Sequence, residues 1–495
     1  MSSIDEIRDA RIKKLELLKA RGINPYPAES KRELSLIEAI DSFETLEKKN
    51  EIKWISGRIM SIRGQGAIVF VTLNDGTAHF QSLLKKDSLG DEKFNLFSEV
   101  VDIGDFIEVQ GNFFTTKRGE KTIEAKDWRI LSKSLRPLPE KWHGLQDIEE
   151  IYRNRYLDLI MDKSAFDLFV TRSKIIKSIR EYLDKKNFLE VETPILQNQA
   201  GGAMAKVFKT YHNDYAMDMV LRIALELDHK KIMTGGYEKV YEIGKCFRNE
   251  GSDPTHIQEF TMLEWYAAYE TLETNIKWTE EMIKQLAFDV VGKKTFKVLD
   301  KEEKEIEVNF DGEWPRVSFG NLLKENANMD IKNISLSDIQ KEAIKWGMSK
   351  EEAMKTGRGN LLDFIYKKSS RIKIINPTFV IKFPGDLKPL ARQNDDGTAE
   401  VAQLVIAGAE ITNQYAELVD PQVQRELLIS QSKAKEKGDE EAMEIDETFL
   451  LAMEHGMPPM TGFGMGIDRL TAILTEHKNL RDVIFFPIMK PKNNE

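Results

Sequence analysis

Three segments of this chain combine residue types that could do chemistry, and the first is VYEIGKCFRNEGSDPTHIQEFTMLEWY at 240–266. Its pattern predicts two strands joined by a loop that contains glycine and proline. Arg248 and Glu250 lie where the first strand meets the loop, and loops held on rigid strands are the usual position of catalytic groups. A charged hairpin on a sheet surface would give the same pattern, so this segment alone leaves both interpretations open.

The second segment is GFGMGIDRL at 462–470, in which three alternating glycines precede a predicted helix. The spacing is not GxGxxG, so it does not match a dinucleotide-binding fingerprint. Glycine allows a backbone or a ligand to approach closely. Arg469 would lie in the first helical turn, where a cation opposes the helix dipole, which favours a functional role such as a phosphate contact. A tight packing turn is the alternative.

The third segment, 383–421, places polar groups in an otherwise apolar strand pattern. Glu410, Asn413, Tyr415 and Glu417 are the residues concerned. A glutamate in a buried strand is costly unless it is paired, so a binding site is one interpretation. An edge strand with solvated carboxylates is the other.

The elements that position these segments follow from the periodicity along the chain. Residues 4–21 and 33–50 predict two helices, and five short alternating segments then suit a small closed barrel such as an OB-fold, with other small barrels still possible. A proline-containing stretch follows, and strands and helices mix beyond it. We therefore expect an α+β chain with a helical extension at 1–50, a barrel at 51–135, a linker at 136–150, and a larger domain at 151–492 with a helical insertion at about 320–372.

Composition narrows the class of protein. The chain has 31% charged residues and no run of 18 apolar residues, so a membrane span is not expected. A single cysteine, Cys246, excludes an internal disulfide and a thiolate metal cluster, and the N-terminus lacks a signal-peptide pattern. These features predict a cytoplasmic protein. The net charge of -10 argues weakly against nucleic-acid binding, although an acidic protein can still present a basic stripe.

Taken together, the three segments resemble the signature motifs of class II aminoacyl-tRNA synthetases, in the order and spacing of the lysine-specific branch of bacterial type. FLEVETPIL at 188–196 resembles motif 1 of that family, which implies a homodimer interface around Pro194. The resemblance implies a mainly antiparallel catalytic sheet flanked by helices, behind an OB-fold that binds the anticodon. It also implies a lysine–tRNA ligase that activates L-lysine with ATP to lysyl-adenylate and transfers it to the 3′ end of tRNA-Lys, forming AMP and diphosphate.

The same resemblance assigns roles around the nucleotide. Arg248 and Arg469 match the family's catalytic arginines. Glu410 matches a ligand of Mg²⁺, and Gln403 stands where the family usually has a second glutamate; a neutral amide binds Mg²⁺ less well than a carboxylate. The residues that match ATP contacts are Arg248, Glu250, His256, Phe260 and Arg469.

The expectation of lysine rests on carboxylates. A buried ammonium is costly without anionic partners. Glu226 and Glu417 match the two residues of the family that recognise the side chain of lysine. A relative that used aspartate would need a cation at the floor of the pocket, whereas the matching positions here are acidic. The residues that match lysine contacts are Gly202, Glu226, Glu264, Tyr266, Asn413, Tyr415 and Glu417.

In the barrel, the positions that match anticodon contacts are Arg63, Phe70, Gln81 and Glu120. Besides Gln403, two departures from the family pattern stand out. Leu225 replaces a usual proline, and Ile257-Gln258 replaces Asn-Pro in the loop of the 240–266 segment, which resembles motif 2 of the family. Two other functions remain open: a catalytically silent RNA-binding paralogue, which Gln403 motivates, and a ligase that puts lysine on a protein, whose known relatives lack the barrel.

Overall fold

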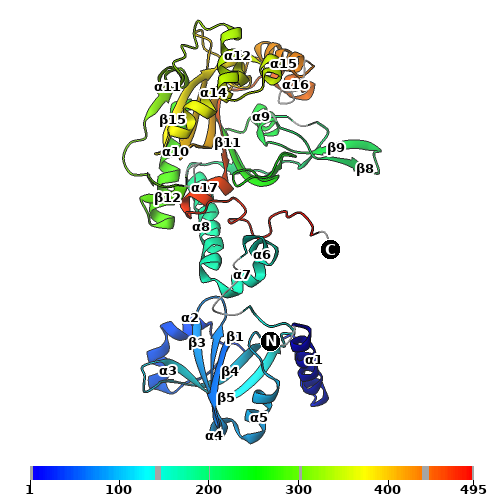
Figure 1. The fold of residues 1–495 in the computed structure, drawn as a ribbon, viewed down its shortest axis with the longest axis vertical. Helices are drawn as coiled ribbons and strands as arrows, with labels where there is room; N and C mark the ends of the chain where they lie inside the picture. The colour runs from blue at the N-terminus through cyan, green and yellow to red at the C-terminus, as the bar shows by residue number, and fades with distance from the viewer. Residues whose placement is uncertain are drawn as a thin grey trace. The chain divides into compact units, whose positions relative to one another are not determined.

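The alternating segment after residue 51 forms a closed five-stranded barrel in the computed structural model (Figure 1). Its strand order is β1-β2-β3-β5-β4, in which β3 and β5 are parallel and the other neighbours are antiparallel. The predicted barrel is therefore confirmed. The strands are β1 (Ile52–Gln65), β2 (Ile68–Asn74), β3 (His79–Lys85), β4 (Phe106–Thr115) and β5 (Lys121–Ser132).

The structure describes residues 4–139, 147–199, 201–203, 205–299, 304–436 and 445–492. The chain divides into two units, Met1–Gln146 and Asp147–Glu495. Residues 140–146 of the predicted linker lie outside the described residues. None of the helices in the described ranges combines the length and the apolar composition that crossing a membrane requires.

The helices of the first unit cover the barrel. The prediction of a single helix over 33–50 is wrong, because the chain turns at Ser42 and forms two short helices instead. Phe43 from the second of them packs against Phe80 and Phe113 of the barrel, with ring centroids 6.2 and 6.1 Å away. The helices are α1 (Ile4–Ala20), α2 (Leu36–Asp41), α3 (Phe43–Lys49), α4 (Lys86–Leu89) and α5 (Asp91–Val100).

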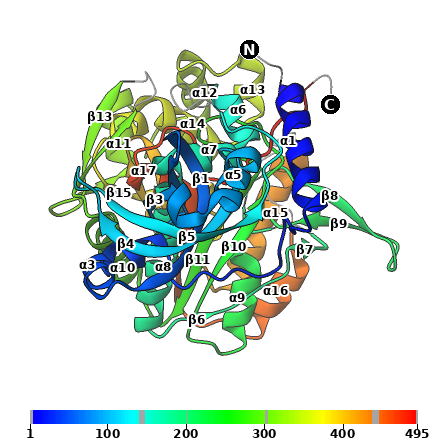
Figure 2. The same ribbon diagram turned by 90° about the horizontal axis from the view of Figure 1, so that it is seen from below.

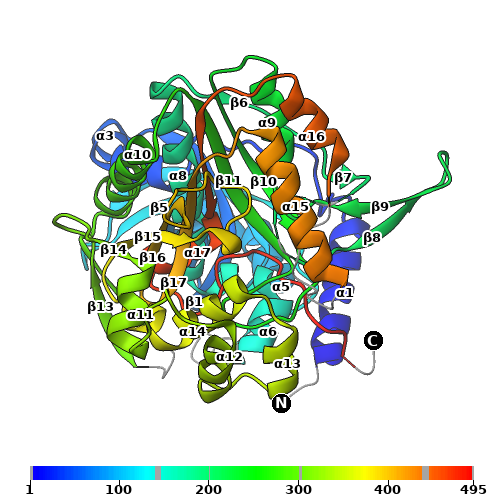
Figure 3. The ribbon, with the colours of Figure 1, turned by 90° about the horizontal axis from the view of Figure 1, so that it is seen from above.

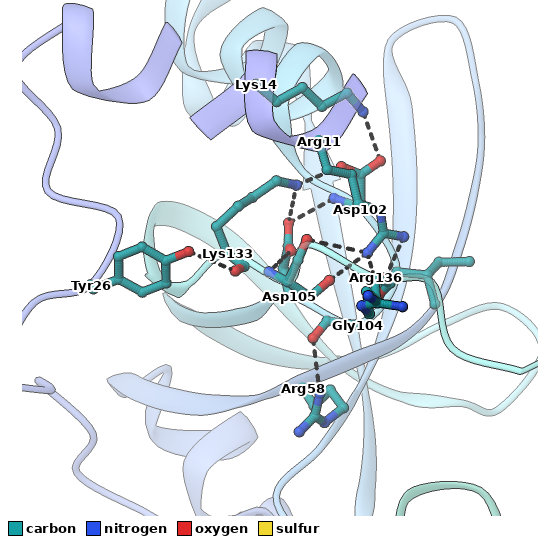
Figure 4. Close-up of polar contacts among 11 residues, drawn as sticks. Arg11, Lys14, Tyr26, Arg58, Asp102, Gly104, Asp105, Lys133 and Arg136 are labelled. Atoms are coloured by element: carbon teal, nitrogen blue, oxygen red, sulfur yellow. Dashed lines mark hydrogen bonds and ion pairs between the residues drawn. The ribbon is translucent and has the colours of Figure 1, made fainter. Parts of the chain in front are cut away.

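Buried charges hold α1 against the barrel (Figure 4). The fully buried Lys133 Nζ lies 2.5 Å from Asp102 and 2.8 Å from Asp105, and Lys14 of α1 reaches Asp102 at 2.7 Å. Arg11 of α1 donates to the Ser134 hydroxyl. Although burial raises the pKa of Asp102, hydrogen bonds from Lys133 and Lys14 bring it below its usual range. The Lys133 ammonium and the two aspartates are thus paired with opposite charges, which such burial requires, whereas Arg11 is held by a hydroxyl and backbone carbonyls.

An eight-stranded sheet forms the centre of the second unit, in the order β14-β15-β16-β17-β18-β11-β10-β6. The two edge pairs are parallel and all the inner pairs are antiparallel, so the predicted mainly antiparallel sheet is confirmed. Its strands are β14 (Arg316–Ser318), β15 (Thr378–Pro384), β16 (Thr398–Ile406), β17 (Ala409–Ala416), β18 (Met460–Gly466), β11 (Glu259–Ala268), β10 (Lys239–Phe247) and β6 (Leu189–Glu190).

Helices pack on both faces of this sheet. One face forms an apolar cluster with α8 and α10, in which Trp265 of β11 stacks on Phe463 of β18 with 3.5 Å between centroids. The other face meets α9, α15 and α16, which lie beside β10 and β11 in Figure 3, and the helices of 319–369. The helices and short helical turns are α6 (Ile148–Arg153), α7 (Arg155–Met161), α8 (Lys163–Lys185), α9 (Glu226–Thr234), α10 (Leu272–Gln285), η1 (Leu286–Val291), α11 (Phe319–Ala327), α12 (Leu336–Lys345), α13 (Lys350–Lys355), α14 (Arg358–Ser369), η2 (Arg371–Lys373), η3 (Gly385–Leu387), α15 (Pro421–Glu436), α16 (Glu447–Glu454) and α17 (Ile467–Leu474).

Two small sheets complete the second unit. One consists of β12 (Thr295–Leu299) and β13 (Glu305–Asn309). In the other, the hairpin of β8 and β9 extends away from the main sheet (Figure 2), and β7 pairs with β9. Its strands are β7 (Leu196–Gln197), β8 (Lys209–His212) and β9 (Met217–Leu221).

Candidate active site

Side chains on one face of β11 and glycines of β18 line the candidate site. Phe260, Glu264 and Tyr266 occur at even spacing along β11, so they point to the same face of the sheet. Gly464 lies opposite Glu264, and Gly462 lies opposite Tyr266, in the adjacent strand. One predicted ATP contact, Phe260, and two predicted lysine contacts therefore share one face, with glycines beside them.

Strand β17 continues this face on the other side of β18. Asn413 lies opposite Gly464, and Tyr415 lies opposite Gly462. The Asn413 amide donates to the Tyr415 hydroxyl at 2.7 Å, while its Oδ1 is buried without a hydrogen-bond partner among the described residues. Buried polar atoms are usually paired, so this oxygen is available to accept from a ligand.

The glycine at 462 makes room for the pocket. An ideal Cβ at this position would lie 2.0 Å from Glu417 Oε1 and 2.6 Å from Cε1 of Tyr266. Real Cβ atoms do not approach other atoms so closely, so any side chain at 462 would push Glu417 or Tyr266 aside. At this position, the alternating glycines of the sequence allow two pocket side chains to approach the strand.

A β-bulge directs Glu410 to the same face. In the pairing of β16 with β17, Gln403 lies opposite Asn413, but Val405 lies opposite Glu410, so β17 has one extra residue between these pairs. An extra residue turns the following side chains to the other face of a strand. Glu410 therefore shares the face of Asn413 and Gln403, although it stands three residues before Asn413.

Arg248 begins the loop between β10 and β11. Its guanidinium carbon lies 5.1 Å from the centroid of the Phe260 ring, and both Nε and Nη2 approach the Ile223 carbonyl at 3.4 Å. These contacts engage few of the five donors of a guanidinium. The half-buried side chain thus keeps donors for an anionic ligand on the face that holds Phe260.

The loop after Arg248 is closed by its own hydrogen bonds. The Arg248 N–H donates to the Gln258 carbonyl at 2.8 Å, and the Gln258 amide donates to the Glu250 carbonyl at 2.9 Å. Ile257 packs against a small apolar cluster that includes Val483. The Ile257-Gln258 departure from the family pattern is thus accommodated by specific contacts.

Two predicted ATP contacts lie exposed on this loop. Glu250 and His256 are both accessible, and the His256 ring pairs with Asp253 at 2.8 Å. The pKa of Asp253 lies below its usual range, because hydrogen bonds from Thr255 and then His256 outweigh the effect of burial. The loop therefore presents His256 already oriented by a carboxylate.

Arg469 joins three parts of the site from the first turn of α17. Its Nη1 donates to the Glu410 carbonyl at 2.5 Å, and its Nη2 donates to the Thr255 carbonyl at 3.3 Å. Burial lowers the pKa of Arg469, the charge of Glu410 opposes this, and the nearby cations Arg371 and Arg248 reinforce it. Three guanidinium groups thus lie near one another, an arrangement suited to a polyanion.

Sequence reasoning missed Arg371, the third of these cations. It follows the helical insertion, and its Nε is buried without a hydrogen-bond partner among the described residues. No motif marks this position, so only the fold associates it with Arg469.

Two acidic side chains that are far apart in the sequence meet on one ammonium group. Lys230 Nζ lies 2.7 Å from Glu226 Oε1 and 2.6 Å from Glu417 Oε2. Lys230 is fully buried, and both glutamates are nearly so. The structure therefore brings the two predicted lysine readers into one pocket, with an ammonium of the chain between them.

Burial dominates the electrostatics of this pocket. It raises the pKa of Glu264 to about 8, and the charge of Glu226 adds to this effect. It also raises the pKa of Glu417 to about 8, although the cation Lys230 opposes the shift. Burial disfavours the ammonium form of Lys230, but Glu226 and Glu417 outweigh it and raise its pKa to about 12. The pocket thus favours a bound cation.

Lys230 is a second residue that sequence reasoning missed, and it corrects one expectation. A cation does lie at the floor of the pocket, although the positions that match the family's readers are acidic. The sequence carried a signal: Glu226 and Lys230 are four residues apart on a helix, the spacing at which such pairs meet. Only the fold adds Glu417 to that pair.

Gly202 and Leu225 approach the pocket with their backbones. Gly202 has φ +80°, and a Cβ there would lie 3.0 Å from Cβ of Glu226. The N–H of Leu225 donates to Glu264 Oε1 at 3.2 Å. A proline at 225 has no N–H, so the leucine found here adds a hydrogen bond that the usual family residue cannot make.

The side chains around Glu410 suit one kind of metal site and not another. In the described part of the chain, no group of three or more His, Cys, Asp or Glu side chains is arranged to hold a metal. Mg²⁺ usually binds one or two carboxylates and completes its shell with waters and substrate phosphates. Glu410, half-buried on the ligand face near Arg469, fits that mode, whereas a metal cage made of protein alone does not.

In the barrel, the predicted anticodon contacts share one face. Arg63 lies opposite Phe70, and Thr72, two residues further along β2, lies opposite Gln81. Residues two apart on a strand point the same way, so Arg63, Phe70 and Gln81 form one surface.

Glu120 lies next to this surface. Gln81 pairs with Thr122 of β5, and its side-chain amide donates to the Thr122 hydroxyl at 2.8 Å. The same hydroxyl donates to the Glu120 carbonyl at 3.1 Å. A partly exposed aromatic ring beside polar groups is the arrangement that single-stranded nucleic acids use for stacking.

Comparison with known proteins gives two family matches. Residues 147–490 match the family of class II tRNA synthetases (D, K and N). Residues 53–131 match the OB-fold nucleic-acid-binding domain of the tRNA anticodon type. The two matches correspond to the eight-stranded sheet with its helices and to the barrel, so the predicted OB-fold is confirmed.

Similar proteins span nearly the whole chain. A lysine–tRNA ligase of Pelotomaculum thermopropionicum is 41% identical over 99% of this chain and 96% of its own length. A lysine–tRNA ligase 2 of Methanosarcina mazei is 41% identical over 97% of this chain and 94% of its own. A lysine–tRNA ligase of Lactococcus lactis subsp. lactis is 42% identical over 99% of this chain and 100% of its own.

Proposed function

We propose, from the premise that this chain belongs to the class II tRNA synthetases of the D, K and N group, that it joins L-lysine to tRNA-Lys at the expense of ATP. The observation that carries this proposal is the meeting of Glu226 and Glu417 in one buried pocket, with Glu264 beside them. Three carboxylates and one ammonium leave an anionic excess that suits a dicationic amino acid and disfavours aspartate. The full-length relatives that are lysine–tRNA ligases support the same substrate.

The first step needs no general base. The ionised carboxylate of lysine attacks the α-phosphorus of ATP in line, an O–P bond forms, and the bond to the leaving diphosphate breaks. Arg248 and Arg469 offer guanidinium donors on the ligand face and offset the charge of the phosphates, so catalysis is chiefly positioning and electrostatic stabilisation. Phe260, beside Arg248, offers a ring on which adenine stacks.

The second step transfers the lysyl group. A hydroxyl of the terminal ribose of tRNA attacks the carbonyl of lysyl-adenylate, an ester forms, and AMP leaves. Glu264, Asn413 and Tyr266 contact the amino acid and hold the carbonyl still during this attack. Their common face on β11 and β17 supports this assignment.

Glu410 is the residue that would hold Mg²⁺, together with the phosphates of ATP. The ion supplies charge neutralisation of the β- and γ-phosphates when it is bound. Gln403 lies on the same face and is the neutral neighbour of this carboxylate. We therefore propose that one protein carboxylate suffices here.

The barrel is proposed to bind the anticodon of tRNA-Lys. Phe70 offers a ring for a base, and Arg63, Gln81 and Glu120 offer polar contacts around it. The match of this segment to a nucleic-acid-binding family supports the assignment.

We also propose a homodimer and a cytoplasmic location. Leu189, Ile195 and Leu196, which flank Pro194, are each more than two-fifths exposed in the single chain, and a second copy would cover them. The cytoplasmic location follows from the role in translation. Sedimentation of the full chain at several concentrations tests the dimer.

An amino-acid-dependent exchange of diphosphate into ATP tests the proposed function. The full chain, with Mg²⁺, should catalyse exchange with lysine and not with the other nineteen amino acids. Exchange with aspartate or asparagine in place of lysine would refute the proposal, and binding of tRNA without any exchange would reveal a silent paralogue. Charging of tRNA transcripts with and without the lysine anticodon then separates a tRNA ligase from a ligase that modifies proteins.

A further inference from the structure

The ammonium of Lys230 occupies the floor of the carboxylate pocket. It lies between Glu226, one helical turn away on α9, and Glu417, which follows β17. Its side chain has no exposure to solvent, and Nζ lies 5.8 Å from the centroid of the Phe449 ring of α16. Such a fully buried lysine is rare unless its charge is paired, and here two carboxylates pair it.

The contacts of Lys230 use one oxygen of each glutamate. Nζ meets Glu226 Oε1 and Glu417 Oε2, so Glu226 Oε2 and Glu417 Oε1 remain for another cation. Glu417 Oε1 lies against Gly462 on the ligand face, 2.0 Å from where a Cβ would stand. The internal ammonium therefore holds one oxygen of each carboxylate and leaves the other oxygen of Glu417 toward the ligand side.

The charges of the pocket then match the substrate. When Glu226, Glu264 and Glu417 are all ionised, the state that a bound ammonium favours, they and the one ammonium of Lys230 give a net charge of -2, which is three negative charges less one positive. Free lysine carries two ammonium groups. Without Lys230, one further negative charge would remain at the floor, and the two glutamates would repel each other.

We propose that Lys230 is a positioning residue that determines amino-acid specificity: it orients Glu226 and Glu417 for one ammonium group and excludes larger cationic side chains from the floor of the pocket. This inference rests on the proposed function. A longer or broader cation, such as the guanidinium of arginine, would have to approach the Lys230 ammonium and would be repelled by it. Lysine, whose ammonium ends above the two free oxygens, would not.

The test compares Lys230→Met with Lys231→Met in the full-length enzyme by diphosphate exchange. Lys231 is the adjacent residue, one-third exposed, and its nearest carboxylates are Asp228 at 3.5 Å and Asp446 at 3.9 Å. Lys230→Met should raise KM for lysine by about tenfold or more with KM for ATP unchanged, because orientation and charge at the floor are lost. The ratio of kcat/KM for arginine to that for lysine should rise by about tenfold. Lys231→Met should change neither.

A second variant separates charge from geometry and covers the case in which Lys230→Met does not fold. Lys230→Arg keeps the positive charge but replaces a compact ammonium by a planar fork. It should raise KM for lysine and still exclude arginine. An unchanged KM for lysine in a folded Lys230→Met or Lys230→Arg enzyme would overturn the inference, as would arginine exclusion that survives Lys230→Met. Failure of the unaltered enzyme to use lysine would instead refute the proposed function.

Discussion

The backbone N–H of Leu225 donates a hydrogen bond to the buried carboxylate of Glu264, at 3.2 Å. This bond lowers the pKa of Glu264, whereas burial and the charge of Glu226 raise it. The pKa of Glu264, a predicted lysine contact, thus depends on the residue type one position before α9.

Replacing Leu225 by proline should therefore weaken lysine binding. The variant loses a hydrogen bond to a charged group, worth roughly 1.5–3 kcal/mol, so KM for lysine should rise by about tenfold at neutral pH. The pKa of Glu264 should rise as well, so part of the loss should be recovered at higher pH. Diphosphate exchange at varied lysine concentration measures this, with Leu225→Met as the control that keeps both the N–H and the volume. Equal KM values for the two variants would contradict the role of this bond.

Gly462→Ala should disrupt the pocket without disrupting the sheet. The new Cβ would meet Glu417 Oε1 at 2.0 Å and Cε1 of Tyr266 at 2.6 Å, so one of these side chains must move. We expect KM for lysine to rise by roughly thirtyfold, or about 2 kcal/mol, as overpacking typically costs 1–3 kcal/mol. Gly466→Ala is the matched control on the same strand, because the nearest atom to its Cβ lies 3.8 Å away. The idea fails if both variants bind lysine alike.

The pH dependence of lysine binding should follow the two buried carboxyl groups. Glu264 and Glu417 have pKa values raised to about 8, mainly by burial. Because ammonium groups bind the ionised forms, KM for lysine should fall as pH rises from about 6.5 to about 8, by about tenfold per pH unit for each group that must ionise. KM for ATP, measured in parallel, should lack this slope. A flat profile for lysine would show that both groups are already ionised.

The free energy of unfolding should fall as pH rises, whereas the affinity for lysine should increase. The same two groups bind protons more tightly in the folded than in the unfolded chain, so they stabilise the fold below the unfolded pKa, near 4.5, and their contribution is lost as pH rises to about 8. Saturating lysine, which favours the ionised forms, should flatten this decline. Thermal unfolding with and without lysine, at pH values across this window, measures both effects. An unfolding midpoint that falls equally with pH in the presence and in the absence of lysine would argue against a role of these two carboxyl groups in lysine binding.

In the barrel, Phe70→Ala should separate the two half-reactions. Loss of a stacking ring costs roughly 1–3 kcal/mol per base, so KM for tRNA-Lys should rise by about tenfold to a hundredfold. Lysine-dependent exchange, which needs no tRNA, should stay within about twofold of the unaltered enzyme because Phe70 lies in the other unit. Charging of a transcript with a changed anticodon provides the control, since it should be poor with either enzyme. An effect of Phe70→Ala on exchange alone would contradict the proposal.

Much of this architecture could be predicted from sequence because alternation determines which face a residue occupies. The barrel strands and the hairpin of 240–266 followed from that period, and so did the common face of Glu264 and Tyr266. The prediction of one helix over residues 33–50 failed because a helical pattern does not reveal the turn at Ser42.

The parts that sequence could not predict depend on contacts between distant segments. Lys230 looks like an ordinary helical partner of Glu226 until the fold brings Glu417 to the same ammonium. The N–H of Leu225 becomes important only because Glu264 of another strand accepts from it. Arg371 belongs to no motif and comes near Arg469 only through the fold.

The extra residue of β17 also affects how this strand tolerates changes of length. Glu410 reaches the ligand side only because the ladder between β16 and β17 is out of step by one position. Deletion of Ile411 would remove the bulge and leave Glu410 two positions before Asn413, so regular alternation would keep the Glu410 carboxylate on the ligand side. The strand can therefore lose its extra residue at this place without turning this carboxylate away from the ligand.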